Sequence, residues 1–67
     1  MVTIFGKNDC PYTDAALENY RRKGEVEYVN VKQDPAGLER MLGYSGGKRR
    51  VPVIVDGSRV TIGFGGT

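Results

Sequence analysis

Two hydrophobic periodicities alternate along this chain, and their order restricts the fold more than any other feature. Short β-branched runs are typical of strands, whereas apolar residues spaced three or four apart are typical of helices. The chain therefore predicts the order strand, helix, strand, helix, strand, strand. The expected ranges are strand 2–5, helix 11–23, strand 26–31, helix 35–42, strand 53–55 and strand 59–62.

The residues at the ends of these segments support the same order. Pro11 and Pro35 suit the first position of a helix, where no backbone N–H is needed, and Asp34 is a good N-cap. Gly24 is expected to stop the first helix. The turn at 56–58, Asp-Gly-Ser, is typical of a tight hairpin.

This element order predicts an α/β fold with a mixed four-stranded sheet and helices on its faces. A right-handed crossover through the first helix would make the first two strands parallel, and the hairpin would make the last two antiparallel. At 67 residues the chain is long enough for one domain, so we expect a single domain over 1–67.

Cys10 is the only cysteine, and it stands where a loop passes into the first helix. The N–H groups and partial positive charge of a helix N-terminus stabilise a thiolate, which is the nucleophilic form. A lone cysteine can also be a small buried hydrophobe. The preceding loop and the following helix start argue against burial, so we expect an accessible, reactive thiol.

Cysteine and histidine counts limit the other possibilities. One cysteine excludes an internal disulfide and a zinc site built from cysteines of one chain, and there is no histidine, so we expect no metal. A single free thiol fits a reducing compartment. With no leader-like or membrane-spanning segment in the sequence, we expect a cytoplasmic protein.

Charge alone does not identify a partner. The net charge of +2 is too small to imply nucleic-acid binding. The cluster 21–23, Arg-Arg-Lys, complements the end of the first helix. The cluster 48–50, Lys-Arg-Arg, comes directly before Val51 and Pro52, and it is either a solvated surface loop or a binding segment.

Several short motifs follow one another in the order found in one family. They are Lys7 three residues before Cys10, the triplet 10–12 (Cys-Pro-Tyr), the pair 51–52 (Val-Pro) before a strand, the hairpin turn at 56–57 (Asp-Gly), and the pair 62–63 (Ile-Gly). With the element order, they resemble the glutaredoxins, a family with the thioredoxin fold. The resemblance covers nearly the whole chain.

The resemblance implies a thiol–disulfide oxidoreductase in which Cys10 is the nucleophile and glutathione the co-substrate. Its partners would be glutathionylated or disulfide-containing proteins, with no nucleic acid and no membrane. It also implies a cis peptide bond at Pro52. The implied glutathione-binding residues are Lys7, Tyr12, Thr13, Arg49, Arg50, Val51, Pro52 and Gly63.

Each of these roles has a simpler alternative. Lys7 either lowers the thiol pKa and holds a carboxylate or is a solvated loop lysine. Tyr12 either flanks glutathione or is a surface aromatic, and Arg49 and Arg50 either pair with its carboxylates or belong to a basic surface loop. Asp9 would oppose thiolate formation if its side chain points toward the sulfur.

The chain departs from the family pattern at three places. Thr13 stands where dithiol glutaredoxins have a second cysteine, so the implied mechanism is monothiol; its hydroxyl either donates to the thiolate or has no role. Phe64 replaces the second glycine of the Ile-Gly-Gly motif. The sequence also ends before the last helix of the family, so we expect exposed apolar surface near Phe64 and Tyr20, which favours a partner or a weak homodimer.

Three further interpretations remain open. The chain is also similar to a small selenoprotein-related subfamily in which selenocysteine occupies the nucleophile position. As an alternative function, two chains and two glutathione thiols could carry an iron–sulfur cluster, although such carriers have Cys-Gly-Phe-Ser, and Pro11 and Tyr12 are bulkier. A binding module using the 48–50 cluster lacks interleaved aromatic residues.

Overall fold

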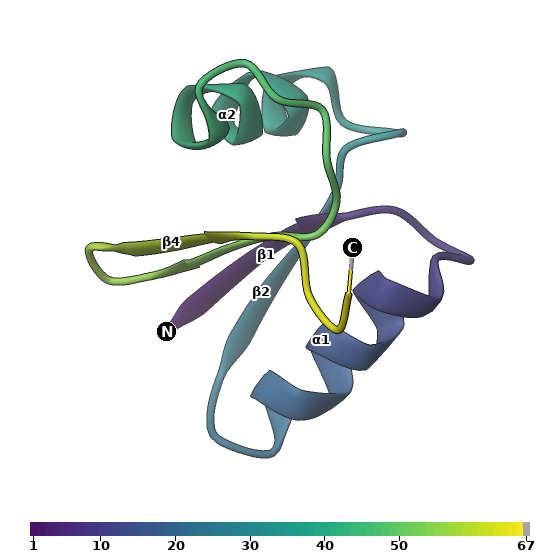
Figure 1. The fold of residues 1–67 in the computed structure, drawn as a ribbon, viewed down its shortest axis with the longest axis vertical. Helices are drawn as coiled ribbons and strands as arrows, with labels where there is room; N and C mark the ends of the chain where they lie inside the picture. The colour runs from purple at the N-terminus through teal and green to yellow at the C-terminus, as the bar shows by residue number, and fades with distance from the viewer. Residues whose placement is uncertain (67) are drawn as a thin grey trace.

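A computed structural model describes residues 1–66 of the chain, and it has one mixed four-stranded sheet with a helix on each face (Figure 1). The strands lie in the order β2-β1-β3-β4. This is the predicted thioredoxin-like arrangement. The elements are β1 (Val2–Gly6), α1 (Pro11–Arg21), β2 (Val26–Asn30), α2 (Pro35–Ser45), β3 (Val53–Asp56) and β4 (Arg59–Ile62).

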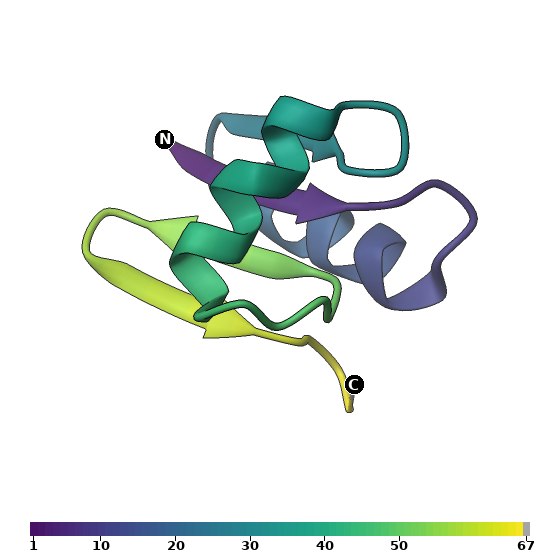
Figure 2. The same ribbon diagram turned by 90° about the horizontal axis from the view of Figure 1, so that it is seen from above.

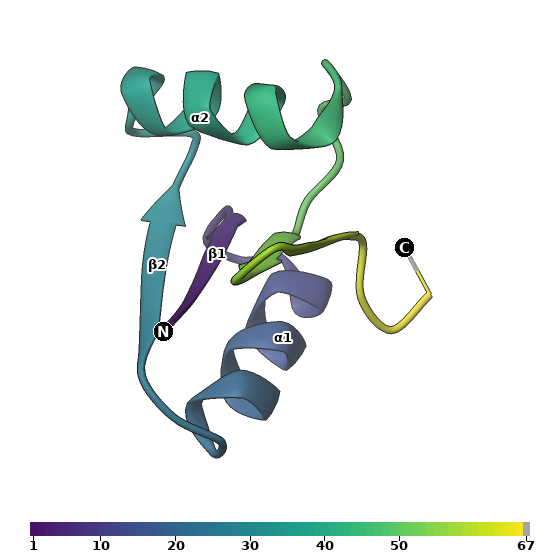
Figure 3. The ribbon, with the colours of Figure 1, turned by 90° about the vertical axis from the view of Figure 1, so that its left-hand side faces the viewer.

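The strand directions are those expected from the sequence. β1 and β2 are parallel and are joined through α1, whereas β3 is antiparallel to both β1 and β4. In Figure 1 the sheet is seen nearly edge-on, with α2 above it and α1 below. Figure 3 shows that α2 begins beyond the tip of β2 and runs steeply inclined to that strand, so that one short helix contacts β1, β3 and β4.

Alternate residues of the strands build two separate cores. Ile4 points to the α1 side and Phe5 to the α2 side, as the period of two requires, and both are fully buried. The α1 core consists of Ile4, Ala16, Leu17 and Ile54, and the α2 core of Phe5, Val29, Met41 and Val53.

Both helices end at a residue other than the predicted one. α1 ends at Arg21 and not at residue 23, because the N–H groups of Lys23 and Gly24 both donate to the Tyr20 carbonyl, at 3.0 and 3.2 Å, and close the helix in a turn. Gly24 does not have the left-handed conformation of a glycine cap. The glycine expected to stop the first helix therefore only follows it.

The second helix is longer than expected and runs to Ser45 in place of residue 42. Gly46 is left-handed, with φ of 68°, and its N–H donates to the Leu42 carbonyl, so it is the residue that ends the helix. The N-terminal prediction is confirmed, since the Asp34 side chain accepts a hydrogen bond from the Gly37 N–H at 3.0 Å.

The segment after β4 turns back along α1. Phe64 is half-buried against the α1 core, and its ring centroid lies 6.2 Å from that of the half-buried Tyr20. The predicted exposure of these two rings is therefore wrong, because each covers the other and the core. The sequence predicts little regular structure for residues 63–67, and Thr67 of this segment lies outside the described residues. No helix within residues 1–66 is long and apolar enough to cross a membrane.

Sheet register brings three connections to one end of the molecule. Gly6 is level with Asn30, and Phe5 is level with Val53, so β1 and β2 end where β3 begins. The loops at 7–10, 31–34 and 46–52 consequently meet at this end, which lies to the right in Figure 2. We call it the loop end.

Candidate active site

Cys10 occupies the N-cap position of α1, at the loop end of the sheet. It is only 7% exposed, so the expectation of an accessible thiol is wrong. The chain reaches Cys10 through Asp9, which has a positive φ of 62°, and the Cys10 carbonyl accepts a hydrogen bond from the Asp14 N–H at 2.9 Å, which fixes Cys10 at the start of the helix. The thiol is nevertheless at the helix start that the sequence indicated.

The surroundings of Cys10 favour its charged form. The Thr13 hydroxyl is the largest cause that lowers the pKa of the thiol below its ordinary value, and burial acts in the opposite direction. The backbone N–H groups of Thr13 and Tyr12, and the positive charge of Lys7, lower the pKa further. The net effect is a lowered pKa, so Cys10 ionises more readily than a free thiol.

Thr13 is fully buried, and its Oγ1 has no hydrogen-bond partner. A buried hydroxyl without a partner is unfavourable, but a thiolate on Cys10 would accept its proton in a hydrogen bond and satisfy both groups. This favours the donor role for Thr13 over the alternative in which it has none.

Gly6 provides the space that brings Thr13 to this position. A Cβ on Gly6 would lie 2.4 Å from Thr13 Cγ2 and 2.7 Å from Oγ1, closer than real atoms approach. The last residue of β1 therefore has to be glycine for α1 to start this close to the sheet. Sequence analysis missed Gly6, although a glycine between a strand and a reactive loop is a sign of close backbone approach.

Pro52 and Gly63 lie at the same end. The Val51–Pro52 peptide bond is cis, as expected, and the Gly63 N–H donates to the Pro52 carbonyl at 2.7 Å. Gly63 is buried with φ of 92°, which a glycine adopts readily. The N–H and C=O groups of Val51 have no hydrogen-bond partner among residues 1–66, so they are available to an extended ligand.

A cleft of about 200 Å³ opens at the loop end on the α2 side of the sheet. Lys7, Lys32 and Arg49 supply cationic side chains to it, and the remaining lining residues are apolar, namely Val31, Leu38, Met41 and Val51. The structure thus brings Lys7, Arg49 and Val51 together as predicted, whereas Arg50 is exposed and does not line the cleft.

Tyr12 projects from the first turn of α1 and is 41% exposed. Gly65 of the C-terminal segment lies beside it, since a Cβ on Gly65 would be 4.0 Å from the Tyr12 ring. The aromatic ring is therefore accessible near Cys10, as either role proposed for it requires.

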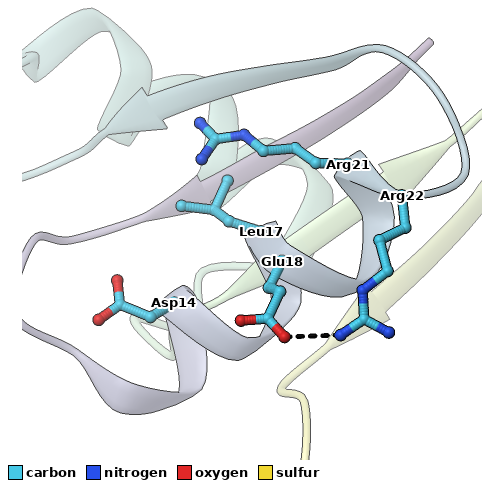
Figure 4. Close-up of a pocket in the computed structure, with 5 residues that line it drawn as sticks. All are labelled: Asp14, Leu17, Glu18, Arg21 and Arg22. Carbon is cyan, nitrogen blue, oxygen red and sulfur yellow. Dashed lines mark hydrogen bonds and ion pairs between the residues drawn. The ribbon is translucent and has the colours of Figure 1, made fainter.

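A larger hollow of about 540 Å³ lies along α1, from Asp14 in its first turn to Arg22 just past its last residue (Figure 4). Its charges are mixed, and Glu18 and Arg22 pair with each other across it at 2.6 Å. The smaller cleft at the loop end is the candidate binding site, because its cations have no ion-pair partner among residues 1–66 and one of them, Lys7, acts on Cys10, which itself does not line the cleft. Within the described part of the chain, no group of three or more cysteine or acidic residues could hold a metal ion.

The sequence model of the glutaredoxin family matches residues 2–60, which include Cys10, the cleft and Pro52. The chain belongs to the glutaredoxin family. It is accordingly a glutaredoxin-like thiol–disulfide redox protein. No curated protein gives a significant match to the chain.

Solved structures give the same fold. NrdH-redoxin from Escherichia coli, described as a glutaredoxin-like protein with a thioredoxin-like activity profile, is 33% identical over 94% of this chain and 82% of its own, with a TM-score of 0.72. Glutaredoxin from Archaeoglobus fulgidus is 23% identical over 96% and 75% of the two chains, with a TM-score of 0.76. Buckwheat glutaredoxin, solved in complex with glutathione, is 21% identical over 92% of this chain and 59% of its own, with a TM-score of 0.72.

Proposed function

We propose that this glutaredoxin reduces glutathione mixed disulfides by a monothiol mechanism through Cys10. The observation that carries the proposal is the pairing of a thiol of lowered pKa with the buried, unpartnered hydroxyl of Thr13. Cys10 is the only thiol of the chain, so a second sulfur cannot form an internal disulfide with it.

The reaction has two exchanges. The Cys10 thiolate attacks the glutathione sulfur of a mixed disulfide, which forms a Cys10–glutathione disulfide and releases the target thiolate to take up a proton. The thiolate of a second glutathione then attacks the glutathione sulfur of this adduct. Oxidised glutathione leaves and the Cys10 thiolate is restored. Oxidised glutathione thus combines the glutathione of the mixed disulfide with the second glutathione, and one free glutathione is consumed for each target thiol released.

The binding roles follow from the chemistry of glutathione, an extended peptide with two carboxylates. The unpaired N–H and C=O groups of Val51 would hold its backbone, and Lys7 and Arg49 in the cleft would hold a carboxylate. Arg50 would act from outside the cleft. Tyr12, Pro52 and Gly63 would complete the wall around the cysteine of the ligand.

Mass spectrometry after incubation with oxidised glutathione tests the proposal. We expect one glutathione per chain, located on Cys10, and complete release of the adduct by reduced glutathione. Cys10→Ser should form no adduct, and Arg21→Gln, on the far part of α1, should behave as the unchanged protein. If Cys10 forms no adduct over a wide pH range, the monothiol mechanism is wrong.

A second candidate function comes from the relative with 33% identity, whose activity profile is described as thioredoxin-like. In this case a dithiol reductase, and not glutathione, would restore Cys10 after it has formed a mixed disulfide with its target. Comparing turnover with glutathione and with a thioredoxin reductase system separates the two. The iron–sulfur carrier, the selenoprotein relation and the cytoplasmic location remain predictions; absorbance of anaerobically purified protein would reveal a bound cluster.

A further inference from the structure

The three loops around Cys10 carry more positive charge than their own acidic residues balance. Lys7, Lys32 and the 48–50 cluster of Lys-Arg-Arg contribute five cations, against the two carboxylates of Asp9 and Asp34. Asp34 is already used as the helix cap. None of the five cations forms an ion pair within residues 1–66.

Cations elsewhere in the molecule have acidic neighbours. Arg22 pairs with Glu18 at 2.6 Å, and Arg40 lies 3.6 Å from Glu27. Lys23 and Arg59 line a hollow together with Glu25 and Asp56, and Arg21 lines the hollow along α1 that includes Asp14 and Glu18. The loop end is therefore where unpaired positive charge gathers, and the other surfaces are close to balanced.

Glutathione accounts for only part of this charge. It has two carboxylates and one ammonium group, and Lys7, Arg49 and Arg50 already provide a cation for each carboxylate with one to spare. Lys32 and Lys48 are exposed on two different loops, and neither is needed to pair with a carboxylate of glutathione. The remaining positive charge thus favours a ligand that is more acidic and more extended than glutathione.

Resting on the proposed function, we propose that the loop end docks acidic protein segments that carry the disulfide to be reduced. The positive charge of Lys7 acts on Cys10, and the other four cations lie on loops at the same end. Charge of one sign gathered at the end that carries the nucleophile attracts acidic segments over a distance of about 10 Å at moderate salt. The free backbone groups of Val51 favour a segment in an extended conformation. A protein is favoured over a nucleic acid because the thiol at this end exchanges disulfides.

Two glutathionylated peptides that differ only in having glutamate or lysine runs beside their cysteine test the proposal. We expect the acidic peptide to be reduced at least about tenfold faster at low salt, and the ratio to approach one at high salt because ions screen the attraction. A small substrate without a peptide run beside the disulfide, the mixed disulfide of glutathione and 2-mercaptoethanol, measures the exchange chemistry without docking of a protein segment. Equal rates for the two peptides at low salt would overturn the proposal.

A matched pair of variants separates the local charge from the net charge. Lys48→Glu, at an exposed residue outside the cleft, should reduce the preference for the acidic peptide by at least about threefold and leave turnover of the small substrate within about twofold. Lys23→Glu makes the same change in net charge at the far end and should keep the preference. If both variants reduce the preference equally, the effect belongs to the net charge and the docking surface is refuted.

A binding measurement keeps the two proposals distinguishable. The acidic peptide with its cysteine replaced by serine should bind Cys10→Ser protein, as followed by fluorescence anisotropy, even if catalysis with glutathione fails. A single-stranded oligonucleotide of equal charge should compete poorly. Competition as strong as that of the peptide would show a general polyanion site and would overturn the assignment to proteins.

Discussion

Replacing Gly6 by alanine should disturb the structure around Cys10 more than its size suggests. The added Cβ would lie 2.4 Å from Thr13 Cγ2, so either β1 or α1 has to move. β1 is held by β2 and β3 on its two sides, and the Gly6 carbonyl accepts a hydrogen bond from the Val31 N–H at 2.9 Å. We therefore expect the first turn of α1 to shift.

The magnitude follows from the cost of overpacking a tight core. One extra methyl group in such a position lowers the free energy of unfolding by about 1–3 kcal/mol. Urea unfolding, with the midpoint compared at constant m-value, measures this loss. Displacement of Thr13 should also raise the pKa of Cys10 toward its ordinary value, because the hydroxyl is the main cause of the lowering. Alkylation rate against pH measures that second effect.

A double-mutant cycle shows whether the clash with Thr13 is the cause. Thr13→Ala removes Cγ2 and Oγ1, the two atoms nearest to the added Cβ. Gly6→Ala should then cost much less in the Thr13→Ala background, with a coupling energy of about 1–2 kcal/mol. If the two substitutions are additive, or if Gly6→Ala leaves both stability and the pKa of Cys10 unchanged, the close approach of Gly6 to Thr13 is not what positions the helix start.

Three further outcomes are expected. Because the pKa of Cys10 is lowered in the folded state, the folded protein binds fewer protons than the unfolded chain at pH values between the folded pKa and the ordinary value of about 8.5. The free energy of unfolding should thus rise with pH through this window, and the contribution of Cys10 to it should be absent below the folded pKa. Cys10→Ser should remove this pH dependence of stability, as measured by unfolding curves recorded at each pH. Gly43→Ala, at an exposed position of α2 with open space around it, should stabilise the protein by up to about 1 kcal/mol in urea unfolding. Gly37→Ala in the same helix should destabilise it, because the added Cβ would lie 2.4 Å from Val29 Cγ1. Equal effects of the two substitutions would contradict this dependence on local space. Asp34→Ala should lose about 1 kcal/mol in the same assay because the Gly37 N–H loses its acceptor, while Asp34→Asn should keep most of it.

The sequence predicted the element order because periodicity and capping are local properties. Strand alternation in β1 places Ile4 and Phe5 on opposite faces, and Pro11 and Pro35 set the first residue of each helix, wherever the rest of the chain lies. The cysteine at a helix start could be recognised for the same reason. The predicted end of α2 at residue 42 is wrong, because the helix continues through Gly43 to Ser45 and Gly46 ends it. Where the helix ends depends on the path of the following loop, which is not a local property.

The contacts that shape the site depend on tertiary structure. Cys10 is buried, and Thr13 meets Gly6, only because α1 packs against the end of β1. Phe64 is covered only because the chain turns back along α1 to reach Tyr20.

The charge at the loop end also depends on the fold. Lys7, Lys32 and Arg49 are far apart in sequence, and they line one cleft because strand register brings the ends of β1 and β2 level with the start of β3. The conformation of residues a few positions apart depends on local propensity, which can be read from the sequence. Residues 17 to 42 positions apart are brought together by packing and strand pairing across the whole chain, which no local pattern specifies.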